Sequence, residues 1–323
     1  MSTTAPTLRQ LAASGALELP VPGGGATVLR HHQLVELSRH HPVSVGRLAE
    51  AHTDAVAIRT EAGETTAPDI LYGVWASATP DAPVTIDAGW STLTGSKPFC
   101  SGLGIVDRAL ITANDQQGRT WLVDIDATDR PSMRHAGDAW ATPALADTST
   151  GTVTLDAHPL EQGAIIGPPG WYLDRVGFWH GACGPAAAWA GAAIGLVDHA
   201  ATHAGDDHHR LEALGFMRAT VWALRGLLAH AATEIDARPD DRVAARSRAL
   251  ALRHVVERHC TELLDRFSQV FGPRPFTTDA AVAQRFADTH LYLRQHHGTR
   301  DLFDLGTTAD RFEDGPEDCA TDT

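Results

Sequence analysis

One stretch of the chain repeats apolar side chains at the spacing of a long helix. They recur at alternating steps of three and four positions, at Leu214, Met217, Val221, Leu224, Leu228, Ala231 and Ile235. This spacing places them all along one side of a helix. A continuous apolar seam needs a partner helix, so the sequence predicts a helical bundle.

Three neighbouring segments have the same character. A second helix follows Leu252, Val256, Cys260, Leu263, Phe267 and Val270 and is stopped by Gly272 and Pro273. A third follows Val282, Phe286, His290 and Leu293 after a cap at Thr277, Thr278 and Asp279. The fourth, 182–197, is uncharged, consists mostly of Ala and Gly, and is shorter than the roughly 20 strongly apolar residues of a membrane span. Its glycines, Gly184, Gly191 and Gly195, predict close backbone approach, because each costs about 1 kcal/mol relative to Ala in a helix.

The residues before this region have a different pattern. Between 69 and 174, short apolar runs are bounded by Gly, Pro, Asn and Asp, and 114–118 has the composition of a hairpin turn. We expect a β-sandwich or barrel of six or more strands there. Residues 1–68 show brief helical patterns, broken near Pro20 and at Pro42. The predicted fold class is therefore α+β and multidomain: a short N-terminal helical region (1–68), a middle β domain (69–174), an antiparallel four-helix bundle (175–306) and an acidic disordered tail (307–323).

Charge and cysteine content limit the partners and the setting. Lys and Arg number 26 against 40 Asp and Glu, a net charge of −14, and no basic stripe stands out. This argues against nucleic acid as a partner. Four widely spaced cysteines and the lack of a recognisable targeting segment at the N-terminus favour a reduced, cytoplasmic setting without a membrane anchor.

The segment GWSTLTGSKPFCSGLGIVDRALITA, Gly89–Ala113, resembles the middle-domain signature of the acyl-CoA dehydrogenases. A Gly and a Lys are followed by an aromatic residue, one interposed residue and a Ser. The order of helical lead-in, β domain and bundle is also similar to that family, with a shortened N-terminal region. The resemblance implies FAD held between the β domain and the bundle, and a homodimer or homotetramer whose subunits complete the cofactor site.

The resemblance also assigns cofactor-binding residues. Phe99 takes the place of the aromatic residue near the flavin, and Ser101 that of the hydroxyl residue at its redox edge. In a regular strand both would share one face, with Cys100 on the other. GVWAS, Gly73–Ser77, lies where the family has a further flavin-contacting strand, so Trp75 and Ser77 are candidates too. Without the resemblance, Phe99 and Ser101 would pass for a core aromatic and a surface hydroxyl, and Trp75 for a packing residue.

The catalytic base of the family has no counterpart that the sequence identifies. The family often places a Glu before a Gly-Thr pair, but here His297 precedes Gly298 and Thr299. Glu212 and Glu234 cannot be placed against the flavin, so the catalytic residues stay unknown. The family's Arg-x-x-x-Phe-Gly segment, which helps to hold the FAD pyrophosphate, is also not recognisable.

Three functions follow from these similarities and departures. The first is an FAD-dependent oxidoreductase acting on a CH–CH group of an acyl thioester or similar small molecule, with a separate electron acceptor. The second is a flavin-dependent monooxygenase of the same superfamily, served by a reductase, in which His180, His296 or His297 accompanies the flavin. The third is a non-catalytic binding or assembly subunit, which would pair with a longer homologue.

Two other patterns have simpler interpretations. The doublets His31-His32, His40-His41, His208-His209 and His296-His297 do not predict a metal site, because adjacent helix residues point about 100° apart. WHGACGPAAAWAG, 179–191, could face a substrate, but we favour tight helix packing. Cys100 and Cys183 are expected to be small buried hydrophobic residues.

Overall fold

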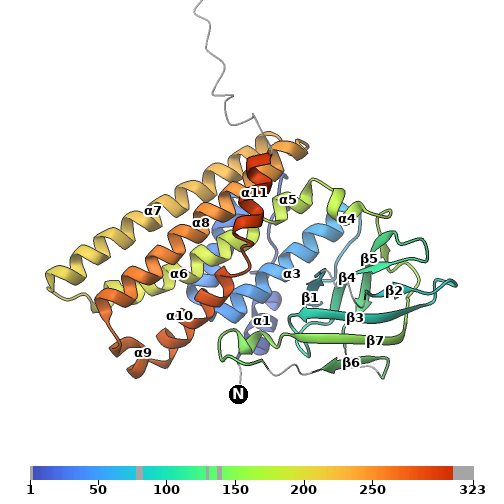
Figure 1. Ribbon diagram of the computed structural model, residues 1–323, viewed down its shortest axis with the longest axis horizontal. Helices are drawn as coiled ribbons and strands as arrows, with labels where there is room; N and C mark the ends of the chain where they lie inside the picture. The colour runs from blue at the N-terminus through green and yellow to red at the C-terminus, as the bar shows by residue number, and fades with distance from the viewer. Residues whose placement is uncertain (1–2, 78–82, 129–130, 137–139, 308–323) are drawn as a thin grey trace, which may run out of the picture.

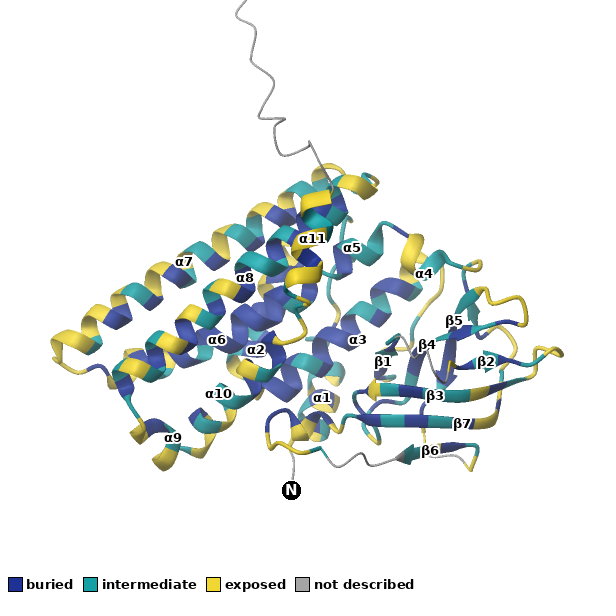
Figure 2. Cartoon of the chain, viewed as in Figure 1, coloured by how far each residue is buried: buried dark blue, intermediate teal, exposed yellow. Residues whose placement is uncertain are grey.

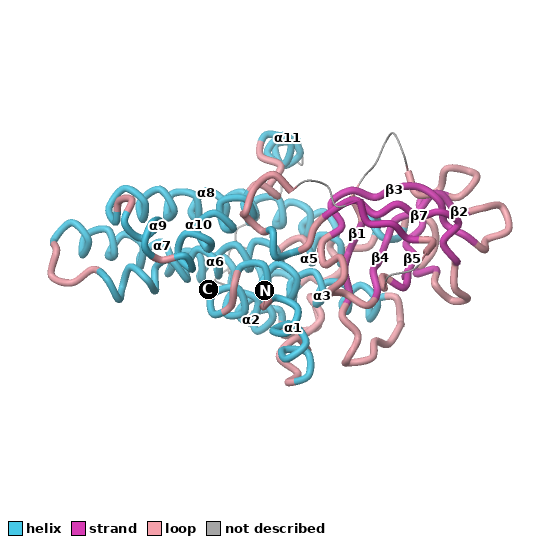
Figure 3. The backbone as a smooth tube through the Cα atoms, turned by 90° about the horizontal axis from the view of Figure 1, so that it is seen from below, coloured by secondary structure: helices cyan, strands magenta, loops and turns pink. Residues whose placement is uncertain are grey.

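Helices and strands occupy opposite ends of the molecule, which we describe from a computed structural model covering residues 3–77, 83–128, 131–136 and 140–307. The long helices lie side by side at one end and the strands gather at the other (Figures 1 and 3). The α+β organisation predicted from the sequence is confirmed. Of the predicted acidic tail, only Thr307 belongs to the described residues, as the last residue of a helix.

The N-terminal region consists of three helices. They are α1 (Thr4–Ala13), α2 (Thr27–His40) and α3 (Val43–Glu61). The breaks fall where the sequence predicts them: the segment from Pro20 to Gly25 precedes α2, and Pro42 is the N-cap residue of α3. Proline suits a helix start because the first N–H groups of a helix have no intrahelical acceptor.

The middle region forms one eight-stranded mixed sheet. Its strands are β1 (Tyr72–Trp75), β2 (Thr85–Ile86), β3 (Thr92–Cys100), β4 (Arg108–Asn114), β5 (Thr120–Asp126), β6 (Met133–Ala136), β7 (Gly151–Pro159) and β8 (Ile165–Ile166). The order is β6-β7-β3-β2-β4-β5-β8, and β1 pairs in parallel with β4. The predicted hairpin joins β4 to β5, and Gly118 supplies a φ of 76° in its turn.

The rest of the described chain is helical. A 3-10 turn (Ala146–Thr148) precedes β7, and α4 (Trp171–Asp174) and α5 (Gly177–Gly181) lead from the sheet into the bundle. The bundle helices are α6 (Gly184–His203), α7 (His208–Ala237), α8 (Arg242–Phe271) and α10 (Ala280–Leu293), with the short α9 (Arg274–Thr278) and α11 (Thr299–Thr307). Every seam residue of α7 is buried except Val221, which is half-buried. No helix within the described ranges is long and apolar enough to cross a bilayer.

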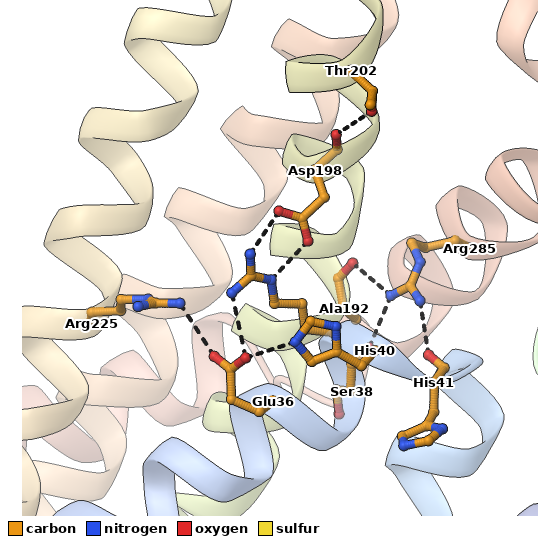
Figure 4. Close-up of polar contacts among 10 residues, drawn as sticks. Glu36, Ser38, His40, His41, Ala192, Asp198, Thr202, Arg225 and Arg285 are labelled. Carbon is orange, nitrogen blue, oxygen red and sulfur yellow. Dashed lines mark hydrogen bonds and ion pairs between the residues drawn. The ribbon is translucent and has the colours of Figure 1, made fainter.

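The N-terminal helix α2 packs into this bundle against α6 and α7. A Cβ on Gly191 of α6 would lie 2.1 Å from the carbonyl oxygen of Val35, so glycine allows the two backbones to meet. Arg39 of α2 donates two hydrogen bonds to Asp198 of α6, at 2.7 and 2.8 Å. Arg285 of α10 bonds the carbonyls of Ser38, His41 and Ala192, in the network of Figure 4. The predicted close approach of the Ala/Gly helix is confirmed, and its partner is α2.

Helix α3 connects the two ends of the molecule. Ala55 and Ile58 pack with β1, β4 and β5, whereas Val43 joins the bundle core. Val45, Leu48 and Ala49 form a further cluster with α1. Figure 2 shows α3 buried along most of its length. A helix enclosed on several sides can carry charged residues only where they find partners or a cavity, and one face of α3 does this.

Candidate functional site

A cavity of about 550 Å³ lies where the sheet meets the helices. Residues of α3, β3, α5, α8 and α11 line it, together with residues at the end of β1. In Figure 1 α4 and α5 lie at the end of α3, where the helices meet the sheet. The volume lies within the roughly 300–1,000 Å³ of small-molecule sites. A cavity at the junction of the β-rich and helical regions is the natural candidate for a cofactor and substrate site.

Phe99 of β3 forms the sheet side of this cavity, with Val74, Ala76 and Ser77. Its side chain is 71% exposed, and its backbone has a φ of 58°, in the left-handed region. A non-glycine residue in that region costs of order 1 kcal/mol or more, and such strain concentrates at functional sites. The pairing of β3 with β7 shifts register between Lys97 and Cys100, so Phe99 lies in a bulge, where it is exposed and lines the cavity.

Buried contacts hold this bulge from behind. The Lys97 ammonium donates to the Ser77 carbonyl at 2.9 Å and to the Thr112 hydroxyl at 2.8 Å, and burial lowers the Lys97 pKa. The Ser77 hydroxyl donates to the Pro98 carbonyl at 2.6 Å. Lys97 and Ser77 therefore fix the end of β1 against β3 and set the position of Phe99.

The four sequence-predicted cofactor residues occupy two places. Phe99 and Ser77 line the cavity, but Trp75 and Ser101 do not. Trp75 is 1% exposed in the sheet core, and its indole N–H donates to the Ser101 carbonyl at 2.9 Å. The Ser101 hydroxyl lies 2.8 Å from the Thr150 hydroxyl. The regular strand face that would have carried Phe99 and Ser101 together is interrupted by the bulge, while Cys100 is buried as expected.

Helix α3 brings two carboxylates and an arginine to the opposite side of the cavity. Arg47, Glu50 and Asp54 lie three and four positions apart and so share one face of the helix. Burial raises the pKa of Glu50 from 4.5 to about 7, although Arg47, 3.5 Å from its carboxylate, opposes the shift. Burial also raises the pKa of Asp54 above its usual value. Glu50 can therefore take up or release a proton near neutral pH.

Two glycines of the WHGACG segment give these carboxylates room. A Cβ on Gly181 would lie 2.5 Å from the Asp54 carboxylate, and one on Gly184 would lie 3.0 Å from that of Glu50. Gly181, Ala182 and Pro185 also line the cavity. The segment thus combines the two interpretations that its sequence allowed, since the same small residues pack closely and face the cavity.

Arg253 of α8 adds a second cation to the helix side. Its guanidinium donates to the carbonyls of Ala182 and Gln295, each at 3.1 Å, and lies 4.8 Å from the centre of the Trp189 ring. Burial lowers its pKa. The structure describes no carboxylate within ion-pair distance of Arg253, so backbone carbonyls and an aromatic face hold it in position.

The C-terminal helix α11 and the preceding turn form the rim. His297, Arg300, Asp301 and Asp304 line the cavity there. The His297 ring lies 3.5 Å from the Asp301 carboxylate, and Arg246 of α8 lies 3.4 Å from Asp304. His296 is not one of the lining residues; its ring lies 5.5 Å from that of His254, and its Nε2 lies 3.8 Å from the Asp301 carboxylate. Of the two histidines at the family's Glu position, the structure brings His297 to the cavity.

A second cavity of about 370 Å³ lies behind the first and shares Asp54 and Arg175 with it. His180 lines it; its Nε2 bonds the Pro239 carbonyl at 2.8 Å, its buried Nδ1 has no hydrogen-bond partner, and burial lowers its pKa. Glu212 pairs with Arg266, and Glu234 with Arg248, both away from the main cavity. Among the described residues, no His, Cys, Asp or Glu cluster has the arrangement of a metal site.

Sequence reasoning missed the carboxylates of α3. Arg47, Glu50 and Asp54 sit within an otherwise apolar helical pattern, and charged residues at such spacing usually mark a solvated face. The available signal was the length of the apolar pattern around them, since Val45, Leu48, Ala49, Ala55 and Ile58 cover more than one side of the helix.

Comparisons with known proteins identify the fold of this chain. No protein-family model matches the chain, and no curated protein matches it in sequence. Solved structures do match. Dibenzothiophene monooxygenase TdsC from Paenibacillus sp. A11-2, also solved with FMN bound, is 18% identical with a TM-score of 0.79 over 94% of this chain and 92% of its own.

Two further solved structures show the same similarity. KijD3, solved with FMN and a dTDP-amino-keto-sugar, is 15% identical with a TM-score of 0.79, over 95% of this chain and 88% of its own. Butyryl-CoA dehydrogenase from Megasphaera elsdenii is 16% identical with a TM-score of 0.75, over 93% of this chain and 88% of its own. The chain therefore has the acyl-CoA dehydrogenase fold, as the sequence resemblance predicted, at low sequence identity.

Proposed function

We propose that this protein is a flavin-dependent oxidoreductase whose reaction takes place in the main cavity. The observation that carries the proposal is Phe99, which lines the cavity from a strained bulge at the position that the sequence resemblance assigns to the aromatic residue near the flavin. Strain of this kind persists only where surrounding contacts impose it, and Lys97 and Ser77 supply them.

The residues of the cavity suit a flavin. A flavin is planar and largely apolar with one hydrogen-bonding edge, and it supplies two-electron redox chemistry when bound. Phe99 and Val74 offer an apolar surface, Ser77 offers a polar one, and Arg300 at the rim offers a cation for a phosphate. The FMN complexes of TdsC and KijD3 favour FMN over the FAD that the sequence resemblance implies.

Glu50 is the group that we assign to proton transfer. Oxidation of a C–H bond next to an activating group needs a base, and a base works best when its pKa lies near the working pH. The pKa of Glu50 is about 7 in the cavity wall. In this reaction the ionised Glu50 would take a proton from a small-molecule substrate, for which an acyl thioester is the sequence-based candidate, and the substrate's hydride would pass to the bound flavin. Arg47, 3.5 Å away, favours the ionised form of Glu50 that accepts the proton.

Monooxygenation is the second candidate. The likeness to dibenzothiophene monooxygenase and the presence of His297 at the rim, where the dehydrogenase family has its Glu, favour it. A separate reductase or electron donor would then supply reduced flavin. A non-catalytic role and the homodimer or homotetramer remain sequence-based hypotheses.

The first test is to purify the chain from riboflavin-supplemented cells and to identify heat-released flavin by its absorption spectrum and mass. We expect stoichiometric FMN, or uptake of added FMN, and a lower affinity in Phe99→Ala. A protein that takes up neither FMN nor FAD would contradict the proposal. Candidate substrates are then mixed anaerobically with the oxidised protein. Bleaching of the flavin indicates dehydrogenation, whereas turnover only with a reductase and oxygen indicates monooxygenation.

A further inference from the structure

Arg253 is placed as a receptor for an anion. Its two carbonyl contacts, with Ala182 and Gln295, use two of its five N–H groups, and the Trp189 ring lies against its guanidinium. The structure describes no carboxylate paired with it, although it lines the main cavity. A buried guanidinium favours an anionic partner, since leaving its charge unpaired costs free energy.

No neighbouring carboxylate pairs directly with Arg253. Asp301 and Glu50 act on its pKa through space, but neither lies within ion-pair distance of it. Asp301 instead lies 3.8 Å from His296 and 3.5 Å from His297, and Glu50 lies 3.5 Å from Arg47. The guanidinium of Arg253 therefore has no direct carboxylate partner among the described residues, and its other N–H groups can bind an anion.

We infer that the substrate is a small organic oxyanion, a carboxylate or a phosphate-type acid, whose acid group is bound by Arg253 of α8. This inference rests on the proposed function, because it names the substrate class of the same cavity. Arg253 and Phe99 come from α8 and β3, so the acid group and the redox centre are held by different elements. Arg300, exposed at the rim, stays available for the phosphate of the cofactor.

The charged residues of the helix side also make this cavity unsuitable for a substrate with a long apolar chain. Arg47, Glu50 and Asp54 of α3 lie on the helix side with Arg253. Burial of a hydrocarbon chain against these groups would desolvate them without compensation. A compact acid instead replaces the lost water with a charge-assisted hydrogen bond to Arg253.

The test compares benzoate and phenylphosphonate with neutral benzamide, by calorimetric titration of the FMN-loaded protein at constant ionic strength. We expect both anions to bind the wild-type protein about tenfold or more tightly than benzamide, as one charge-assisted hydrogen bond allows. Arg253→Gln should remove this preference and Arg253→Lys should keep part of it. Arg258→Gln is the matched control, because Arg258 lies exposed on the same helix outside the cavity. Equal affinities of the wild-type protein for benzoate and benzamide would overturn the inference. This outcome needs no variant, so it does not depend on whether a variant folds.

A second arm separates the substrate from the cofactor phosphate. The affinities of FMN and riboflavin are measured for wild type and for Arg253→Lys, which keeps the charge. We expect their ratio to be the same in both proteins. If the variant weakens FMN but not riboflavin, Arg253 binds the cofactor phosphate and the inference is wrong. If no flavin binds but benzoate is still preferred over benzamide in the flavin-free protein, the proposed function fails while the anion site stands.

Discussion

The two sides of the main cavity are built on different principles. The sheet side is largely apolar and comes from β1 and β3, whose residues are fixed by a bulge and by buried contacts of Lys97 and Ser77. The helix side is charged and combines Glu50 and Asp54 of α3 with Arg253 of α8. Two short segments of neighbouring strands supply the first, whereas packing of distant helices creates the second.

The two sides of the cavity are therefore expected to have different functions. An apolar wall with one exposed ring suits a planar cofactor, and a wall of buried charges suits proton transfer and recognition of a polar molecule. Changes on the sheet side should therefore alter flavin binding, and changes on the helix side should alter reaction rate, pH dependence and substrate binding. The following substitutions test whether the two sides are separable.

The largest effect is expected for Glu50→Gln. If Glu50 accepts the substrate proton, its loss should slow substrate-dependent flavin reduction by about 100-fold or more, the usual range for a general base. Flavin affinity should change little, because Glu50 lies on the helix side. Stopped-flow absorbance measures the rate, and Glu36→Gln on α2, outside the cavity, is the control. An unchanged rate would remove Glu50 from the reaction and favour monooxygenation.

The next largest effect is expected in how the free energy of unfolding depends on pH. A carboxyl group whose pKa rises from 4.5 to about 7 on folding binds more protons in the folded state, so its contribution to stability is lost as pH rises through that interval. Relative to wild type, Glu50→Gln should gain up to about 3 kcal/mol over the interval. Urea unfolding at several pH values measures this.

The comparison with wild type also cancels the contributions of titratable groups that do not interact with Glu50. Burial lowers the pKa of His31 and His52 to about 4, and these shifts make stability rise with pH. They are present in both proteins. A pH-independent difference between wild type and Glu50→Gln would show that Glu50 is not perturbed in the folded state.

Phe99→Gly should separate binding from stability on the sheet side. Glycine adopts a positive φ without the steric cost of about 1 kcal/mol that Phe99 bears, so the free energy of unfolding should rise by about that amount. Flavin affinity should fall about tenfold with loss of the aromatic surface. Ala157→Gly controls for the backbone, because Ala157 also has a positive φ, of 48°, but lies outside the cavity. Loss of stability in Phe99→Gly would mean that Phe99 packs as a core residue.

The smallest effect is expected for Ser101→Ala. Its hydroxyl lies 2.8 Å from that of Thr150 rather than in the cavity wall, so the substitution should cost about 1 kcal/mol of stability and leave flavin affinity unchanged. Ser77→Ala should weaken flavin binding more, because Ser77 lines the cavity. Fluorescence titration with FMN compares the two. A stronger loss in Ser101→Ala would restore Ser101 to the flavin contact that the sequence resemblance assigns to it.

Local patterns predicted much of this protein. The apolar seam of 214–235, the cap at Asp279, the hairpin at Gly118 and the change from strands to helices all depend on neighbours in sequence, and each appears in the structure. Phe99, which a short contiguous motif singled out, lines the cavity, and its contact with a flavin stays a prediction. The burial of Trp75 agrees with its alternative interpretation as a packing residue. The contact of the Ser101 hydroxyl with Thr150 was not predicted, because a bulge between Lys97 and Cys100 changes the strand geometry.

The sequence by itself determined the helical bundle, the β-rich middle and the aromatic residue of the sheet side, because periodicity and a short motif carry that information. Only the tertiary structure decided that α2 joins the bundle and that α3 turns Glu50 toward a cavity shared with Arg253, more than 200 positions away. The physical reason is desolvation. The pKa of Glu50 and the burial of Arg253 without a directly paired carboxylate arise from what surrounds them, and those surroundings exist only after distant helices have packed.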